Sequence, residues 1–99
     1  MFEGGFIYVG PGMDPQKQRA VIPSEGMNMT VVGVSNYAQA EEVVKEMVAN
    51  GCTAIELCAG FGDEGIARMK KAAGPDVLIG AVKFDLHPAL GHKSGDEFF

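Results

Sequence analysis

A single carboxylate and a single thiol interrupt one apolar run of this chain, and they are the first candidates for chemistry. The run, AIELCAGFGDEG, spans residues 54–65 and carries Glu56 and Cys58. Charged side chains are seldom buried unless they are paired, and Lys83, inside the apolar run AVKFD, is the obvious counter-charge for Glu56. The two residues predict a structural ion pair, within one chain or at a subunit seam. The functional alternative is a desolvated Lys83 that forms a Schiff base, with Glu56 as general acid/base.

A second set of candidates lies near the C-terminus, in DLHPALGHKSGDE. His87 could activate Cys58 as a nucleophile, because a thiolate needs a base or a helix N-terminus; a thiol that only packs is the alternative. Imidazole and carboxylate groups also suit zinc, iron or manganese, so Asp85, His87, His92 and Asp96 form a candidate set of divalent metal ligands. The alternative is that the histidines satisfy backbone hydrogen bonds. No cofactor other than such a metal is predicted.

The glycine-rich turn in the same run allows two interpretations. Gly60, Gly62 and Gly65 have the G-x-G-x-x-G spacing of a dinucleotide-binding loop. However, Asp63 and Glu64 stand where a phosphate would approach, and their charge would repel it. We therefore expect a tight turn with Asp63 as the cap of a following helix, and keep nucleotide binding as the alternative.

These candidates must be positioned by an alternation of apolar strands and amphipathic helices. Asn36 is the expected cap of one helix, which ends at Asn50-Gly51, and a second helix runs from Asp63 to Gly74-Pro75. Asp14-Pro15 predicts one or two helical turns within residues 14–22, ending near Pro23. The runs expected to be strands cover residues 6–9, 29–35, 53–59 and 77–84.

Strands that are apolar on both faces and alternate with helices indicate a parallel sheet with right-handed crossovers. The prediction is one α/β domain over residues 1–99, with a mainly parallel sheet of about four strands and two principal helices. Residues 85–99 are expected to form an irregular tail whose Phe98 and Phe99 pack on the domain or on a partner subunit. Two helices do not easily cover both faces of the sheet, so a homo-oligomer is expected. Its seam would be the sheet face that carries Ala54, Gly80, Val82 and Phe84.

In parallel sheets, ligands bind outside the carboxyl ends of the strands. This rule selects four loops, at residues 10–12, 35–36, 60–63 and 85–88. The candidate catalytic residues are Glu56, Lys83 and His87. The candidate ligand-binding residues are Ser35, Asn36, Gly60, Gly62 and Asp85.

Composition excludes several classes of partner. The 99 residues carry a net charge of −5, and the eight Lys and Arg residues are scattered rather than gathered into the basic face that nucleic acid requires. No apolar run approaches the roughly 18–20 residues of a membrane helix. The N-terminal stretch does not resemble a signal peptide, and Cys52 and Cys58 do not form a CxxC pattern. A cytoplasmic protein with reduced thiols is expected.

Two resemblances follow from longer stretches. The stretch from TVVGVSNYAQAEEVVKEMVANGCTAIELCAGFG to VKFDLHPALGHKSGDE resembles a bacterial family of about one hundred residues whose function is unknown. This likeness covers nearly the whole chain and implies no activity. MVANGCTAIEL is similar to the βα units of barrel aldolases of the 2-keto-3-deoxy-6-phosphogluconate type, which implies an acid/base role for Glu56. The Schiff-base lysine of those barrels comes from a much later strand, and Lys83 does not match it.

Three functions remain open. The first is binding or sensing of a small molecule at the carboxyl edge of the sheet, which predicts an apolar pocket with few titratable groups. The second is a small lyase, isomerase or hydrolase that uses Glu56, Lys83, Asp85 and His87. The third is a structural or regulatory homo-oligomer, in which Phe98 and Phe99 plug the same edge.

Overall fold

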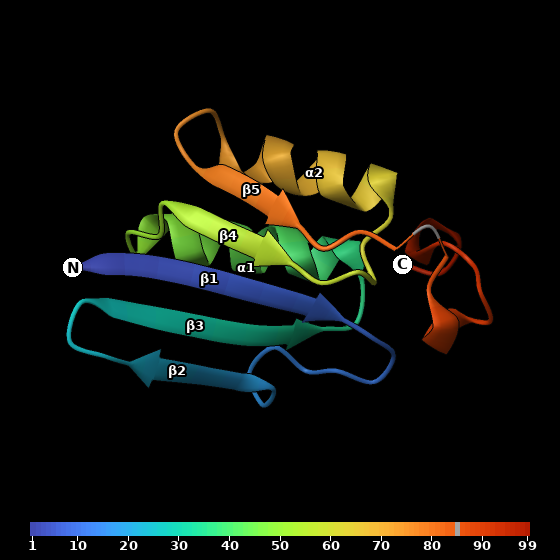
Figure 1. The fold of residues 1–99 in the computed structure, drawn as a ribbon, viewed down its shortest axis with the longest axis horizontal. Coiled ribbons are helices and arrows are strands. Elements are labelled where there is room, and N and C mark those ends of the chain that lie inside the picture. Colours follow the sequence, from blue (N-terminus) through green and yellow to red (C-terminus); the bar gives the residue numbers. More distant parts are fainter. Residues whose placement is uncertain (85) are drawn as a thin grey trace.

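A five-stranded sheet with two helices on one of its faces forms the protein (Figure 1). The computed structural model describes residues 1–84 and 86–99. The strand order is β2-β3-β1-β4-β5, where the strands are β1 (Phe2–Val9), β2 (Arg19–Pro23), β3 (Met27–Val34), β4 (Ala54–Leu57) and β5 (Leu78–Ala81). β1 is parallel to β3 and β4, and β4 is parallel to β5. The predicted α/β class and mainly parallel sheet are confirmed, but the sheet has five strands rather than about four.

The additional strand is β2, in the region where helical turns were expected. Asp14 begins a single turn, in which its carbonyl accepts hydrogen bonds from the N–H groups of Lys17 and Gln18. The chain then extends and pairs antiparallel with β3. Arg19 fixes this strand to the helix layer, because its guanidinium makes two hydrogen bonds to the Glu46 carboxylate, at 2.9 and 2.8 Å. The predicted helical turns within residues 14–22 are therefore wrong, because the structure has a hydrogen-bonded turn at Asp14 followed by a strand.

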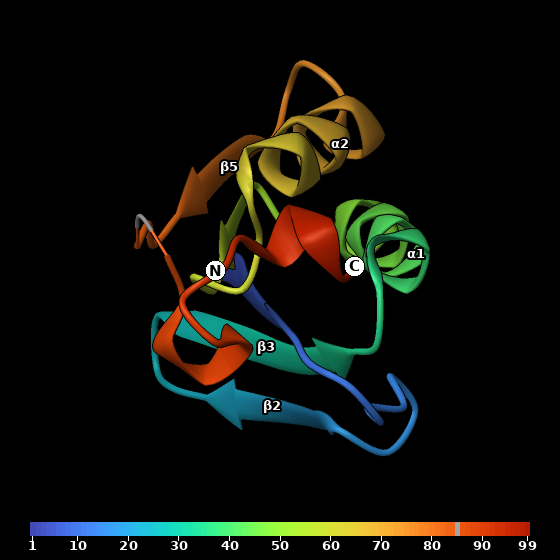
Figure 2. The same cartoon turned by 90° about the vertical axis from the view of Figure 1, so that its right-hand side faces the viewer.

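Both principal helices appear where they were predicted. α1 (Tyr37–Ala49) begins at Asn36, whose side chain accepts a 2.8 Å hydrogen bond from the N–H of Gln39. α2 (Asp63–Ala73) ends at Gly74, which has a φ of 81°. Figure 2 shows the two helices side by side on one face of the sheet, with the other face uncovered. Within the described residues, neither helix has the length and apolar character needed to span a membrane.

The core lies between the sheet and the helices. Alternate strand residues point into it, including Ile7, Val32, Ile55 and Leu57, which are all fully buried. The helices contribute the apolar stripe of α1 together with Met69 and Ala73 of α2, and Phe61 closes the core at the turn before α2. The remaining strand residues form the opposite side of the sheet, which is called the open face below.

Two strand glycines on the open face differ in their surroundings and provide a matched pair for a test. A Cβ at Gly33 would lie 2.6 Å from the ring of Tyr8, whereas a Cβ at Gly80 would meet no atom within 4 Å. We expect Gly33→Ala to lower the free energy of unfolding by about 1–3 kcal/mol, because the Tyr8 ring must move. Gly80→Ala is expected to change it by less than about 0.5 kcal/mol. Urea denaturation measures both, and equal effects would contradict the contact.

Candidate functional site

The segment after residue 85 lies across the carboxyl ends of the parallel strands. It forms two short 3-10 turns, η1 (Pro88–Leu90) and η2 (Gly95–Glu97), and Figure 2 shows it in front of the strand ends. The loops after β1, β3 and β4 reach the same edge, which we call the rim. The expectation that residues 85–99 pack on the domain holds for the described part, because η2 contacts α2 and the Phe99 ring lies 6.4 Å from that of Tyr37.

The turn between β4 and α2 serves as the docking surface for this tail. Gly95 is buried against Gly60 so closely that a Cβ at Gly95 would lie 1.8 Å from the Gly60 carbonyl oxygen. A Cβ at Gly62 would lie 2.4 Å from the carboxylate of Asp96. The glycines therefore permit a close approach of the chain's own backbone. No phosphate is needed to explain them.

Asp96 occupies the N-terminus of α2. Its Oδ2 accepts a 2.9 Å hydrogen bond from the N–H of Glu64, and its Oδ1 accepts one of 3.1 Å from Gly65. The hydroxyl of Tyr37 donates to Oδ1 at 2.6 Å and accepts from the N–H of Gly62 at 3.0 Å. The prediction that Asp63 caps this helix is wrong, since Gly62 is the N-cap residue and Asp63 is the first helical residue.

The same contacts shift the ionisation of both side chains. Burial, reinforced by the hydrogen bond to Asp96, raises the pKa of Tyr37 well above its usual value. Tyr37 therefore stays a hydrogen-bond donor at all ordinary pH values. Partial burial opposes ionisation of Asp96, but the hydrogen bonds from Tyr37, Glu64 and Gly65 outweigh it and lower the pKa of Asp96. A carboxylate thus fills the place at the helix N-terminus where a ligand's anion would bind.

Glu56 and Lys83 do not pair within the chain, so the predicted ion pair is wrong in that form, whereas a pair across a subunit seam stays a prediction. Glu56 is exposed on the open face and lies opposite Gly80 of β5. Lys83 follows β5, which ends at Ala81. Its Nζ lies 3.5 Å from Oδ1 of Asp63 and donates to the carbonyl of Phe84. For the same reason, Glu56 of this chain is not placed to act as general acid/base for a Schiff base at Lys83.

Two of the remaining candidates, His87 and Cys58, have structural partners. His87 accepts a 3.0 Å hydrogen bond from the N–H of Ala89 through Nδ1 and so caps η1. The Sγ of Cys58 accepts from the N–H groups of Val9 and Gly60, at 3.4 and 3.3 Å. Asp85 lies outside the described residues. Among the residues that are described, no group of three or more His, Cys, Asp or Glu side chains is placed to hold a metal ion.

The predicted ligand-binding residues lie at the rim, but internal contacts occupy most of them. Asn36 caps α1, and Gly60 and Gly62 receive the tail. The hydroxyl of Ser35 donates to the carbonyl of Met13, and its N–H donates to the side chain of Gln39 at 2.8 Å. Of these four, Ser35 lines the open space described next.

A cavity of about 520 Å³ lies at the rim between the tail and the ends of β1 and β3. Ser35 is its one hydroxyl, and the other walls are apolar side chains and backbone. The lining residues are Pro11, Gly12, Ser35, Ala89, Leu90, Phe98 and Phe99. Sequence reasoning located the loops and the two phenylalanines but missed Ala89 and Leu90, which carry no polar group that would attract attention.

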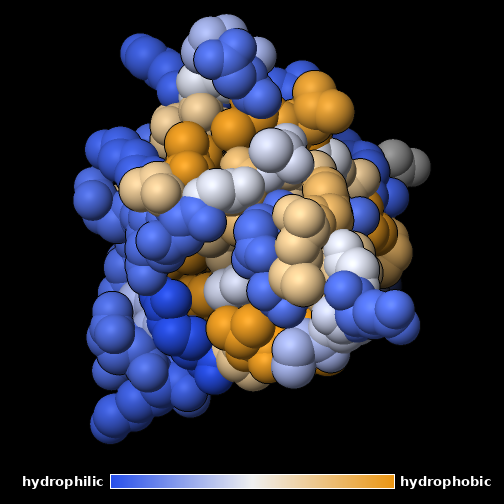
Figure 3. All heavy atoms as spheres, turned by 90° about the vertical axis from the view of Figure 1, so that its left-hand side faces the viewer, coloured by the Kyte–Doolittle hydropathy of each residue, from blue (hydrophilic) through white to orange (hydrophobic). Residues whose placement is uncertain are grey.

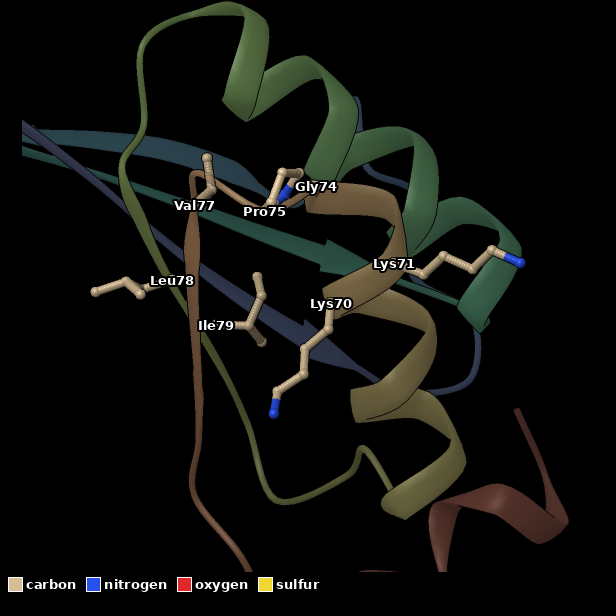
Figure 4. A pocket seen from close by; sticks show the side chains of 7 residues that line it. All are labelled: Lys70, Lys71, Gly74, Pro75, Val77, Leu78 and Ile79. Carbon is tan, nitrogen blue, oxygen red and sulfur yellow. The ribbon is translucent and has the colours of Figure 1, made fainter.

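A second hollow, of about 570 Å³, lies between α2 and β5. In Figure 4, Lys70 and Ile79 point toward the space between the helix and the strand, whereas Lys71 and Leu78 point away from it. Lys70 is therefore the one charged group directed into this hollow among its labelled residues. It stands at the side of the sheet, away from the rim.

Comparison with protein-family models identifies the family of this chain. A family model described as a family of unknown function (DUF6506) matches residues 2–97. The chain belongs to this family. The predicted membership of a family of unknown function is confirmed. The comparisons do not show the likeness to barrel aldolases. No curated protein and no solved structure matched the chain.

Replacing Asp96 tests the cap of α2. Asp96→Ala leaves the N–H groups of Glu64 and Gly65 and the hydroxyl of Tyr37 without their acceptor. We expect the free energy of unfolding at pH 7 to fall by about 1–2 kcal/mol, as measured by urea denaturation. Glu97→Ala, which changes the neighbouring exposed carboxylate, is the matched control and is expected to have little effect.

Comparison of the wild-type protein with Asp96→Ala also gives a prediction about pH. The pKa of Asp96 is lower in the folded than in the unfolded chain, so its contribution to stability is complete above the unfolded value, near 4. It is lost as the pH falls through the folded pKa. The stability difference between wild type and Asp96→Ala should therefore shrink below about pH 4. A difference that stays constant down to pH 2 would show that the carboxylate charge does not matter.

Proposed function

We propose that the protein binds a small, mainly apolar molecule in the rim cavity. The observation that carries this proposal is the cavity itself, about 520 Å³ in volume and walled chiefly by apolar groups. Ligand sites in proteins are typically hollows of about 300–1,000 Å³ with a predominantly apolar lining and a few polar groups that orient the ligand. Here the hydroxyl of Ser35 supplies such a group.

Binding is favoured over catalysis by the character of the lining. None of the seven lining residues has a titratable side chain, whereas acid–base catalysis needs one within hydrogen-bond reach of the reacting group. Two residues that could supply such chemistry lie apart, because Glu56 is exposed on the open face and Lys83 lies beside Asp63 at the start of α2. A strongly anionic ligand is also disfavoured, because Asp96 already fills the N-terminus of α2 and the chain carries a net charge of −5.

The tail would report on occupancy of this site. Four of the seven lining residues, Ala89, Leu90, Phe98 and Phe99, belong to the tail. A ligand that contacts them would hold the tail against the rim and stabilise the folded chain by RT ln(1 + L/Kd), where L is the concentration of free ligand. This coupling fits a sensor, in which binding of a small molecule changes the stability of one segment.

A neutral fluorescent probe, N-phenyl-1-naphthylamine, tests the proposal. We expect saturable enhancement of its fluorescence with one probe per chain, because burial of the probe in the apolar cavity removes it from water. Leu90→Trp should fill part of the cavity and weaken binding at least about tenfold, a change of about 1.4 kcal/mol. Leu78→Trp places the same ring on β5, away from the rim, and should bind as wild type does.

Two outcomes would contradict the proposal. One is the absence of saturable binding by the wild-type protein. The other is equal affinity of wild type and Leu90→Trp, once circular dichroism has shown that the variant is folded. Binding that Ile22→Glu on the open face weakens, while Leu90→Trp leaves it intact, would locate the probe on the sheet instead.

A further inference from the structure

The residues that line the rim cavity use nearly all of their hydrogen-bond donors within the chain. On the strand side, Pro11 has no N–H group, and the N–H of Ser35 donates to the side chain of Gln39 at 2.8 Å. On the tail side, the N–H of Ala89 donates to Nδ1 of His87 at 3.0 Å. None of these groups is left to bind a ligand.

The other tail residues of the lining are engaged in the same way. The N–H of Leu90 donates to the carbonyl of His87 at 3.1 Å. The N–H groups of Phe98 and Phe99 both donate to the carbonyl of Gly95, at 3.0 and 2.9 Å. These bonds form the two 3-10 turns, so the turns that build this wall of the cavity also consume its donors.

The hydroxyl of Ser35 is the one side-chain donor in the lining, and its proton is also engaged, because it donates to the carbonyl of Met13. A serine hydroxyl has one proton to donate and two lone pairs that can accept. The Ser35 oxygen therefore remains available to a ligand as an acceptor. Among the described residues of the lining, Gly12 has the one N–H group without an acceptor in the chain.

We infer that the ligand of the rim cavity is an apolar molecule that carries a hydroxyl or N–H group, which donates to the hydroxyl oxygen of Ser35. This inference rests on the proposed function and names the class of molecule that the same cavity selects. A polar group that leaves water without finding a partner is costly. A ligand's donor finds an acceptor in this lining, whereas a ketone, an ether or a carboxylate finds almost no donor, so the cavity selects between them.

The hollow between α2 and β5 has the opposite character. Lys70 points toward it (Figure 4), and an ammonium group has three donors and no acceptor. A molecule whose polar group only accepts hydrogen bonds therefore fits beside Lys70 better than it fits at the rim. The two hollows are similar in volume, about 570 and 520 Å³, and the hydrogen-bonding character of their walls distinguishes them.

Two naphthalenes of nearly equal size test the inference, because 1-naphthol has an O–H group where 1-methylnaphthalene has a methyl group. Their affinities follow from displacement of N-phenyl-1-naphthylamine, whose own Kd is measured for each protein variant. Ser35→Ala removes the acceptor but keeps the N–H group that binds Gln39. This variant should bind 1-naphthol at least about fivefold more weakly, and 1-methylnaphthalene within about twofold of wild type.

A methyl ether, 1-methoxynaphthalene, determines the direction of the hydrogen bond. It keeps the oxygen of 1-naphthol but has no proton to donate. If the Ser35 hydroxyl accepts from the ligand, Ser35→Ala should leave the affinity for the ether within about twofold of wild type. A hydroxyl that instead donates to the ligand would make the ether and 1-naphthol lose affinity together.

Ser24 provides a matched control at the other end of the sheet. It lies in the turn between β2 and β3, and its hydroxyl also donates to a backbone carbonyl, that of Met27, at 2.6 Å. Figure 3 shows that hydrophobic residues reach the surface at this end as well, where Phe2 and Met27 are 42% and 39% exposed. Ser24→Ala should bind all three naphthalenes as wild type does.

The outcomes separate this inference from the proposed function. Absence of saturable probe binding by the wild-type protein overturns the proposed function and this inference together. If Leu90→Trp weakens probe binding but Ser35→Ala leaves the affinity for 1-naphthol unchanged, only this inference is overturned. The same holds if Ser35→Ala weakens 1-naphthol and its methyl ether equally, or if Ser24→Ala has the same effect as Ser35→Ala. Circular dichroism establishes that the variants are folded.

Discussion

The contact between Asp96 and the N-terminus of α2 determines how the rest of the rim is built. Four polar groups from three parts of the chain converge there: the Tyr37 hydroxyl, the N–H groups of Glu64 and Gly65, and the Asp96 carboxylate. Free N–H groups at a helix start need acceptors, and here the acceptor comes from the tail. Because the carboxylate must reach the helix, the tail lies against the Gly60–Gly62 turn, and the rim cavity forms beside it.

This contact also limits the chemistry that the rim can perform. The G-x-G-x-x-G spacing has the appearance of a phosphate loop, but its glycines admit the tail's backbone and its helix N-terminus is already occupied. The ammonium group of Lys83, a predicted catalytic residue, lies 3.5 Å from the carboxylate of Asp63. The larger cavity at the rim, of about 520 Å³, is lined mainly by apolar groups, and the proposed binding of a small molecule rests on this lining.

The sequence allowed the helices, the parallel core of the sheet and the position of the rim to be predicted, because periodicity and caps are local signals. Asparagine is common at helix N-termini, and Asn36 caps α1; glycine is common at helix C-termini, and Gly74 ends α2. Local signals failed where a distant residue decided the outcome. β2 is a strand because it pairs with β3. Asp63 does not cap α2 because the carboxylate of Asp96, more than thirty residues away, accepts the hydrogen bonds at the start of the helix. The pairing of Glu56 with Lys83 within the chain failed because Lys83 follows the end of β5 and lies beside Asp63 at the start of α2.

Helix α2 receives its cap from a residue 31 to 32 positions downstream, and Tyr37 is bound to a residue 59 positions away. During synthesis, α1 and α2 leave the ribosome before the segment that completes them exists. The N–H groups of Glu64 and Gly65 therefore lack Asp96 as their acceptor until residue 96 has been made. A chain that stops before residue 96 therefore lacks the contact that joins the tail to α1 and α2.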